Sequence, residues 1–172
     1  MSLWLLVGSV AAQSTKTSPS LESLVGTYTY IGNKAKDEAT IQQQIKAATA
    51  GMNMLTSKIA HERLSEGNPI PMRLVMAAKD DTITVTMDQH AVTAPTDGSS
   101  KKTKNIGGHT VQASFHLGKA SLLQDMVQSK GRRENVFSFN KAGNLVMQVK
   151  ESSDELSAPV DYSLLYKRAP KK

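Results

Sequence analysis

The longest periodic pattern of apolar residues in this chain lies between residues 36 and 66. Apolar side chains recur there every three or four residues, and this spacing places them on one face of an α-helix. Gly67 and Pro69 follow, and both residue types end helices. The pattern therefore predicts a single long amphipathic helix, whose first turn is capped by Asn33 or Asp37. The residues of its apolar stripe are Ile41, Ile45, Ala48, Met52, Leu55 and Ile59.

Short runs of alternating polar and apolar residues follow the helix, and a period of two is typical of β-strands. In residues 82–87 the side chains of Ile83, Val85 and Met87 face one way and three threonines face the other. Gly, Asn, Asp and Pro residues between the runs predict tight turns. Residues 121–130 fit a strand or a helix, and the surrounding hairpins favour a strand. Further strands are expected at residues 27–31, 72–78, 90–94, 101–105 (a short edge strand), 109–117, 132–139, 145–149 and 160–168.

Nine or ten short strands joined mostly by tight turns predict antiparallel neighbours, because a hairpin reverses the direction of the chain. A long meander of this kind tends to close into a barrel, since closure leaves no strand edge open. A barrel of about eight to ten strands encloses one small ligand. We therefore predict a mainly β, up-and-down barrel in residues 21–169, followed by a basic tail at 170–172. The long helix, between the first and second strands, is expected to pack on the barrel as a lid or end plug.

The first residues predict export. Residues 3–11 form an uncharged apolar run whose length suits the core of a signal peptide and is too short to span a bilayer. Val10 and Ala12 stand at the −3 and −1 positions of a small-residue cleavage site, which predicts residues 1–12 as a signal peptide and residues 13–20 as a polar linker. No Lys or Arg precedes the apolar run, so an ordinary N-terminal helix is the alternative. Export implies a periplasmic or secreted protein.

Composition narrows the class of function without identifying a ligand. The chain has 172 residues, of which 39% are hydrophobic and 21% charged, the balance of a soluble domain. It has no cysteine, which excludes disulfides and thiolate ligands. The net charge of +6 would suit nucleic acid, anionic lipid or an acidic polymer. The basic residues are spread along the chain and aromatic residues are only 5%, so a solvated basic surface is the simpler interpretation and no nucleic-acid partner is expected.

Motifs for catalysis and metal binding are missing from the sequence. His61 is followed by Glu, but the metalloprotease motif needs a second His where Ser65 stands. His90, His109 and His116 fall on different predicted strands and would have to converge to bind a metal ion. We therefore expect no catalytic residue, no metal and no cofactor. If the protein were an enzyme, the first residues to test would be His90, His116, Tyr28 and Tyr166.

The two ends of the predicted barrel resemble the calycins, the group that contains lipocalins and fatty-acid-binding proteins. Residues 24–28, Leu-Val-Gly-Thr-Tyr, are similar to the opening Gly-x-Trp of lipocalins and Gly-Thr-Trp of fatty-acid-binding proteins. Residues 162–168, Tyr-Ser-Leu-Leu-Tyr-Lys-Arg, are similar to the Arg-x-Tyr-Lys ending of the second branch. Tyr28 stands where Trp is expected, and Leu164 replaces the Arg of the carboxylate clamp, while Tyr166 matches its Tyr. The resemblance implies a lipocalin-like barrel of a bacterial type, but it does not carry the clamp over to this chain.

A helical lid between the first two strands is a further likeness to the fatty-acid-binding branch. That branch has a short helix–turn–helix there, whereas one long helix is predicted for this chain. The resemblance and the barrel pattern together predict a monomeric, non-enzymatic barrel that does not span a membrane. It would bind or carry a small hydrophobic ligand outside the cytoplasm. The alternative is a structural or protein-interaction module of the envelope, with a solid barrel core.

Methionine side chains are flexible and suit an adaptable apolar pocket, although ordinary core packing explains any single one of them. The residues expected to contact the ligand are Tyr28, Met52, Leu55, Ile59, Met76, Val85, Phe115, Met147 and Tyr166.

Overall fold

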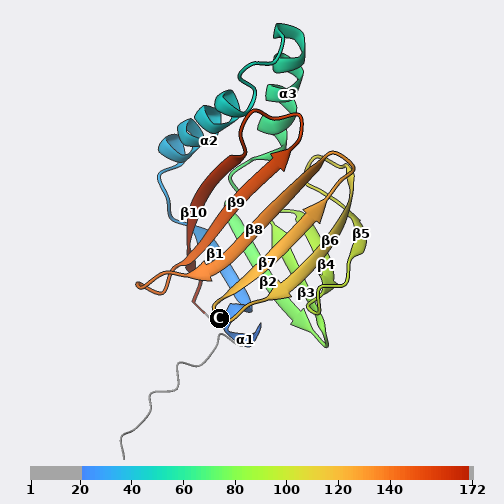
Figure 1. The fold of residues 1–172 in the computed structure, drawn as a ribbon. Helices are drawn as coiled ribbons and strands as arrows, with labels where there is room; N and C mark the ends of the chain where they lie inside the picture. Colours follow the sequence, from blue (N-terminus) through green and yellow to red (C-terminus); the bar gives the residue numbers. More distant parts are fainter. Residues whose placement is uncertain (1–20, 171–172) are drawn as a thin grey trace, which may run out of the picture.

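Ten antiparallel strands form one sheet that curls into a nearly closed barrel in the computed structural model, which describes residues 21–170 (Figure 1). This arrangement confirms the predicted barrel, including the strand at 121–127 and the edge strand at 101–104. The predicted signal peptide and linker lie outside the described residues, as do the last two residues of the basic tail. The strands are β1 (Gly26–Tyr30), β2 (Arg73–Lys79), β3 (Thr82–Met87), β4 (His90–Pro95), β5 (Lys101–Lys104), β6 (Thr110–Leu117), β7 (Ser121–Val127), β8 (Gly131–Phe139), β9 (Leu145–Ser153) and β10 (Val160–Arg168).

The order of strands around the barrel is β4-β3-β2-β1-β10-β9-β8-β7-β6-β5, so β1 closes the meander by pairing with β10. Strands β4 and β5 are the two edges of the sheet. They lie near each other, and no ladder of backbone hydrogen bonds joins them. The sheet is therefore open between these two strands.

The predicted single helix is wrong, because two helices, α2 (Lys34–Ala48) and α3 (Met54–Gly67), occupy this part of the chain. Gly51 adopts a φ of +85°, a left-handed conformation that a helix interior excludes. Asn53 then starts a new helix, since its side chain accepts a hydrogen bond of 3.0 Å from the backbone N–H of Thr56. The break between the helices thus has a local cause in the sequence.

Helix α2 packs on the barrel against β10, where it buries Ile41, Ile45 and Ala48. Asn33 caps it by accepting a hydrogen bond of 3.1 Å from the backbone N–H of Lys36. This confirms one of the two predicted caps. The other candidate, Asp37, instead accepts a hydrogen bond from the Tyr30 hydroxyl, and the distance between the two oxygens is 2.5 Å.

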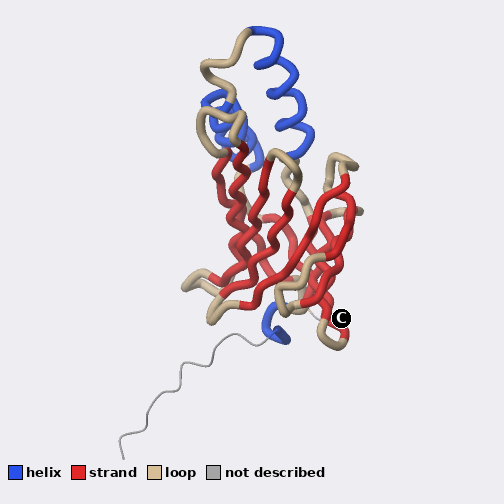
Figure 2. Tube along the Cα trace, turned by 45° about the vertical axis from the view of Figure 1, so that its right-hand side comes forward, coloured by secondary structure: helices blue, strands red, loops and turns tan. Residues whose placement is uncertain are grey.

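Helix α3 rises beyond the ends of the strands (Figure 2). Its side chains are buried only at Leu64, whereas Leu55 is 70% exposed and Ile59 is 43% exposed. The second half of the predicted apolar stripe therefore does not pack on the barrel. No helix among residues 21–170 has the length and apolar character needed to cross a membrane.

The short helix α1 (Leu21–Leu24) covers the end of the barrel opposite α2 and α3 (Figure 1). Arg168, at the end of β10, donates hydrogen bonds to the carbonyl oxygen of Val25 at 2.7 Å and to the hydroxyl of Tyr28 at 2.6 Å. Its guanidinium carbon also lies 4.9 Å from the centre of the Tyr28 ring, within the range of a cation–π contact. The Tyr28 hydroxyl donates in turn to the carbonyl oxygen of Leu24 at 2.8 Å. These contacts close this end and hold the first strand against the last.

Candidate functional site

The other end of the barrel is the mouth, where the helices lie. Because consecutive strands run in opposite directions, the β3–β4, β5–β6 and β7–β8 turns also meet there (Figure 1). A cavity of about 40 Å³, here named the mouth cavity, lies among these turns and the end of α3. Its apolar lining comes from Val85, Met87, Val92, Val111 and Met126, with a further contact from Ile106. Its polar lining includes His90, Gln124, Arg133, Asn135 and Glu151.

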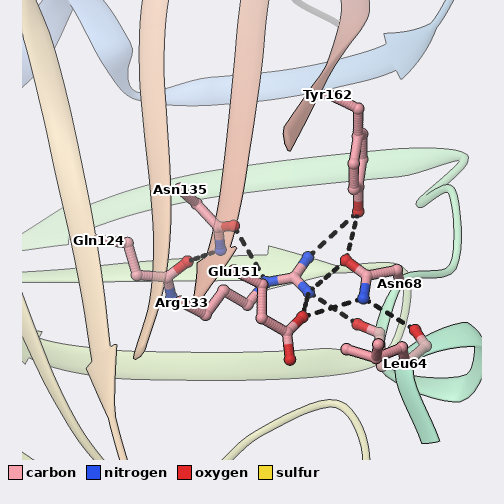
Figure 3. Close-up of polar contacts among 8 residues, drawn as sticks. Leu64, Asn68, Gln124, Arg133, Asn135, Glu151 and Tyr162 are labelled. Atoms are coloured by element: carbon pink, nitrogen blue, oxygen red, sulfur yellow. Dashed lines mark hydrogen bonds and ion pairs between the residues drawn. The ribbon is translucent and has the colours of Figure 1, made fainter. Parts of the chain in front are cut away.

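Arg133, on β8, is the centre of a polar network at this mouth (Figure 3). Its Nη1 donates to the carbonyl oxygen of Gly67 and to Oδ1 of Asn68, both at 2.8 Å, and lies 3.3 Å from Oε2 of Glu151. Its Nε donates to Oδ1 of Asn135 at 3.1 Å. The Arg133 side chain is only 13% exposed, so this ion pair is largely removed from water. The network thereby ties the end of α3 to β8 and β9.

Asn68 and Tyr162 extend the network toward β10 (Figure 3). Nδ2 of Asn68 donates to Oε2 of Glu151 at 2.9 Å and to the carbonyl oxygen of Leu64 at 2.8 Å. The Tyr162 hydroxyl donates to Oδ1 of Asn68 at 3.0 Å. Burial raises the pKa of Tyr162, and the positive charge of Arg133 opposes this effect. The hydroxyl therefore stays protonated and acts as a donor in the network.

Gln124 and His90 carry polar atoms that the network leaves without a partner. Nε2 of Gln124 and Nε2 of His90 are buried and have no hydrogen-bond partner among residues 21–170, and both residues line the mouth cavity. The hydroxyl of Tyr166, in the barrel core, is the third such atom in this part of the chain. A buried polar group without a partner costs roughly 1–3 kcal/mol. Two such atoms around one cavity therefore mark a place suited to a polar group of a ligand.

The structure brings one of the nine predicted contact residues, Val85, to the mouth cavity. Met52 and Ile59 line an open groove of about 670 Å³ between α3 and the β7–β8 and β9–β10 turns, outside the barrel. Leu55 points into solvent and does not line this groove. The other five are at most 1% exposed and belong to the packed core: Tyr28, Met76, Phe115, Met147 and Tyr166.

The polar residues of the mouth were missed by the sequence patterns, although a signal for two of them exists. Gln124 lies between Leu122 and Met126 at an inward position of β7, and all three are buried. Asn135 lies two residues before buried Phe137 at an inward position of β8. An amide at an inward position of an alternating strand is a sign of a buried polar site. At Gln124 the ambiguity of residues 121–130 between strand and helix hid this sign.

The histidines do not share a site. His90 lines the mouth cavity, His109 is exposed in the β5–β6 turn, and His116 contacts Ser114 at 3.2 Å on the outer side of β6. No group of three or more His, Cys, Asp or Glu side chains that could hold a metal ion occurs among residues 21–170. Of the tyrosines considered for catalysis, Tyr28 contacts Arg168 at the closed end and Tyr166 is inside the core. The four candidates for catalysis, His90, His116, Tyr28 and Tyr166, thus form no common pocket.

No family model matches the chain, and no curated protein matches it by sequence. Solved structures do match it. A mutant of the fluorescent protein UnaG superposes with a TM-score of 0.58 at 18% identity, over 88% of this chain and 100% of that one. Fatty-acid-binding protein 1 of Echinococcus granulosus gives 0.54 at 12% identity, over 87% and 99%. Lipid binding protein 8 of Caenorhabditis elegans, in its apo form, gives 0.57 at 9% identity, over 87% and 98%. These likenesses confirm the resemblance at the level of the fold, and the chain has a calycin-like barrel.

Proposed function

We propose that the barrel binds a small, largely apolar molecule at its mouth and does not catalyse a reaction. The observation that carries this proposal is the mouth cavity, whose lining combines valine and methionine side chains with Gln124 and His90, each of which has a buried polar atom without a partner. Ligand sites in proteins have this character, with a mainly apolar lining and a few polar groups that orient the ligand. The names of two proteins of the same fold, a fatty-acid-binding protein and a lipid binding protein, also support the proposal.

The mouth cavity must widen to admit such a ligand. A water molecule needs roughly 10–15 Å³ of cavity, so about 40 Å³ holds only a few atoms. Met87 and Met126 are unbranched and can change rotamer to make room. Val92 belongs to β4, whose edge beside β5 has no ladder hydrogen bonds to break. We therefore expect an apolar chain to enter the barrel between these side chains and along the β4–β5 seam.

An apolar fluorescent probe tests this proposal. We expect saturable binding at one site, and we expect Val111→Phe to weaken it at least about ten-fold, because the larger ring fills the cavity. Thr110→Phe is the matched control, since Thr110 is the neighbouring residue on β6 and is exposed. A denaturation curve for each variant verifies that the barrel is folded. Equal probe affinity for the two variants would contradict binding in the mouth cavity.

A protein-interaction module with a solid core is the second candidate function. The exposure of Met54, Leu55 and Ile59 on α3 favours it, because these apolar side chains are free to contact another molecule. The same probe assay separates the two functions. If the outer face of α3 is the binding surface, Leu55→Ser weakens probe binding and Val111→Phe does not.

We also propose that the protein works outside the cytoplasm, in the periplasm or after secretion. The support is the apolar run at residues 3–11 and the small residues Val10 and Ala12 at its end. Mass spectrometry of the protein recovered from cells that produce it is expected to find Gln13 as the first residue. A chain that still begins at Met1 would contradict export through this segment.

A further inference from the structure

We infer that the polar end of the ligand is an uncharged oxygen acceptor, a carbonyl or a hydroxyl group, which accepts a hydrogen bond from Nε2 of Gln124. This inference rests on the proposed function and names the class of ligand for the same site. It differs from recognition of a carboxylate. A carboxylate needs a positive charge, and the positive charge at this site, that of Arg133, is already paired with Glu151.

The hydrogen-bond network itself fixes which atom of Gln124 is left without a partner. An arginine side chain only donates, so the partner of Arg133 Nε on Asn135 must be the oxygen Oδ1. The Asn135 amide therefore presents its Nδ2 to Gln124, and this Nδ2 donates to Oε1 of Gln124 at 2.7 Å. A flipped Gln124 would set two N–H donors against each other. The remaining Gln124 atom, Nε2, is consequently a donor, and it is the atom that has no partner.

Gln124 is completely buried, so its unpartnered Nε2 is not exposed at the protein surface. A ligand oxygen in the mouth cavity would satisfy one of these donors. His90 lines the same cavity with its own unpartnered Nε2, which can donate or accept according to its tautomer. A carbonyl oxygen accepts from both residues, and a hydroxyl accepts from Gln124 while it donates to His90 or accepts from it.

A carboxylate would find no uncompensated positive charge at this site. Arg133 is the only arginine or lysine among the residues that line the mouth cavity in the described chain, and Glu151 lines it too. The Arg133 donors are directed at Glu151, at the Gly67 carbonyl, at the side chains of Asn68 and Asn135, and at the Tyr162 hydroxyl. A second carboxylate beside Glu151 would be desolvated without a partner for its charge. The site therefore favours a neutral oxygen over a charged one.

A matched set of medium-chain compounds tests this inference by displacement of the apolar probe. The set is an n-alkane, a methyl ketone, a primary alcohol and a fatty carboxylate of the same chain length. We expect the ketone and the alcohol to bind at least about ten-fold more tightly than the alkane and the carboxylate. A carboxylate that binds as tightly as the ketone, or a ketone no better than the alkane, would overturn the inference.

Gln124→Met is the diagnostic variant, because it removes the donor and keeps an apolar side chain of similar length. We expect it to lose the preference for the ketone over the alkane, measured as the ratio of their two affinities for this variant. Gln112→Met, at an exposed position of β6, is the matched control and is expected to keep the full preference. His90→Phe is a second variant that leaves the Gln124–Asn135 bond in place, and it is expected to reduce the preference. If the Gln124→Met protein does not fold, an unchanged preference in His90→Phe decides against the inference.

The outcomes for the inference and for the proposed function can be told apart. If neither the probe nor any compound binds, the proposed function fails. If the probe and the alkane bind but Gln124→Met keeps the same selectivity as the unmodified protein, the function stands and the inference fails.

Discussion

Replacement of Arg133 by alanine is expected to lower the free energy of unfolding by about 3–5 kcal/mol. The substitution leaves the largely buried carboxylate of Glu151 without its cationic partner. It also removes the donors that satisfy the Gly67 carbonyl, Oδ1 of Asn68 and Oδ1 of Asn135. Most of the expected loss comes from desolvated groups that remain without partners. Urea denaturation followed by circular dichroism measures it.

Arg132→Ala is the matched control, because it removes the same side chain from the adjacent residue on the outer face of β8. The Arg132 side chain is 49% exposed and pairs with Asp125 at 2.8 Å, and surface pairs of this kind contribute about 1 kcal/mol or less. A loss for Arg133→Ala no larger than that for Arg132→Ala would show that the polar network does not hold the mouth together. The double variant Arg133→Met with Glu151→Leu is expected to recover much of the stability, since no buried charge is left unpaired.

The second large effect is expected in alkaline solution, where the four tyrosines of the chain stay protonated until the barrel unfolds. Desolvation by burial is the main cause that raises the pKa of Tyr28, Tyr30, Tyr162 and Tyr166. The hydrogen bond to Asp37 and its negative charge raise the pKa of Tyr30 further, whereas Arg168 opposes the shift at Tyr28. The folded barrel therefore holds these protons more tightly than the unfolded chain does.

The sign of the pH dependence follows from these raised pKa values. An unfolded tyrosine ionises near pH 10, so the stability contributed by the buried phenols is fully present below about pH 10 and is lost as the pH rises above it. Each tyrosine that ionises only in the unfolded chain lowers the free energy of unfolding by about 1.4 kcal/mol per pH unit. All four tyrosines contribute in the same direction.

Phenolate absorbance and circular dichroism, recorded together across an alkaline titration, measure this effect. We expect the phenolate signal to rise in the same transition as the loss of β-structure, at a pH well above 10. In denaturant the same tyrosines are expected to titrate near pH 10. A phenolate signal that appears near pH 10 while the barrel is still folded would show that the tyrosines are accessible to water.

Strand alternation made the barrel predictable from the sequence. In residues 82–87, Ile83, Val85 and Met87 are buried, as the period of two requires. The turn residues separated the strands well enough to predict nine or ten strands with antiparallel neighbours, and the structure has ten. The likeness of residues 24–28 and 162–168 to the calycins also holds at the level of the fold, since β1 pairs with β10.

The break in the helical segment was predictable in principle, and the periodicity concealed it. Met52 continues the spacing of the stripe from Ala48, so the apolar pattern runs across the break without a gap. A glycine such as Gly51 costs roughly 1 kcal/mol in a helix interior, and asparagine, as at Asn53, is a favoured residue for the N-cap of a helix. These two local preferences outweigh the continuous apolar periodicity and divide the segment into two helices. The two helices that result are joined by a turn, as in the fatty-acid-binding branch. The single long helix predicted from the sequence had set this chain apart from that branch, and the structure does not contain it.

The polar network was beyond a prediction from sequence because its members meet through the register of the sheet. Gln124 pairs with Asn135 across β7 and β8, and Arg133 pairs with Glu151 across β8 and β9. A shift of one residue in either register would turn these side chains to the opposite face. Asn68 joins them from the end of α3, far away in the sequence. Alternation gives the face of each strand, but it does not give the partner opposite each residue.

Methionine methyl signals in nuclear magnetic resonance test binding at the mouth cavity most directly. Met87 and Met126 line the cavity, whereas Met54 is 89% exposed on α3 and Met147 is buried in the core away from it. Titration with the apolar probe is predicted to shift the methyl signals of Met87 and Met126 along one saturable curve and to leave Met54 and Met147 nearly unchanged. Shifts at Met54 with none at Met87 and Met126 would contradict a ligand site inside the mouth of the barrel.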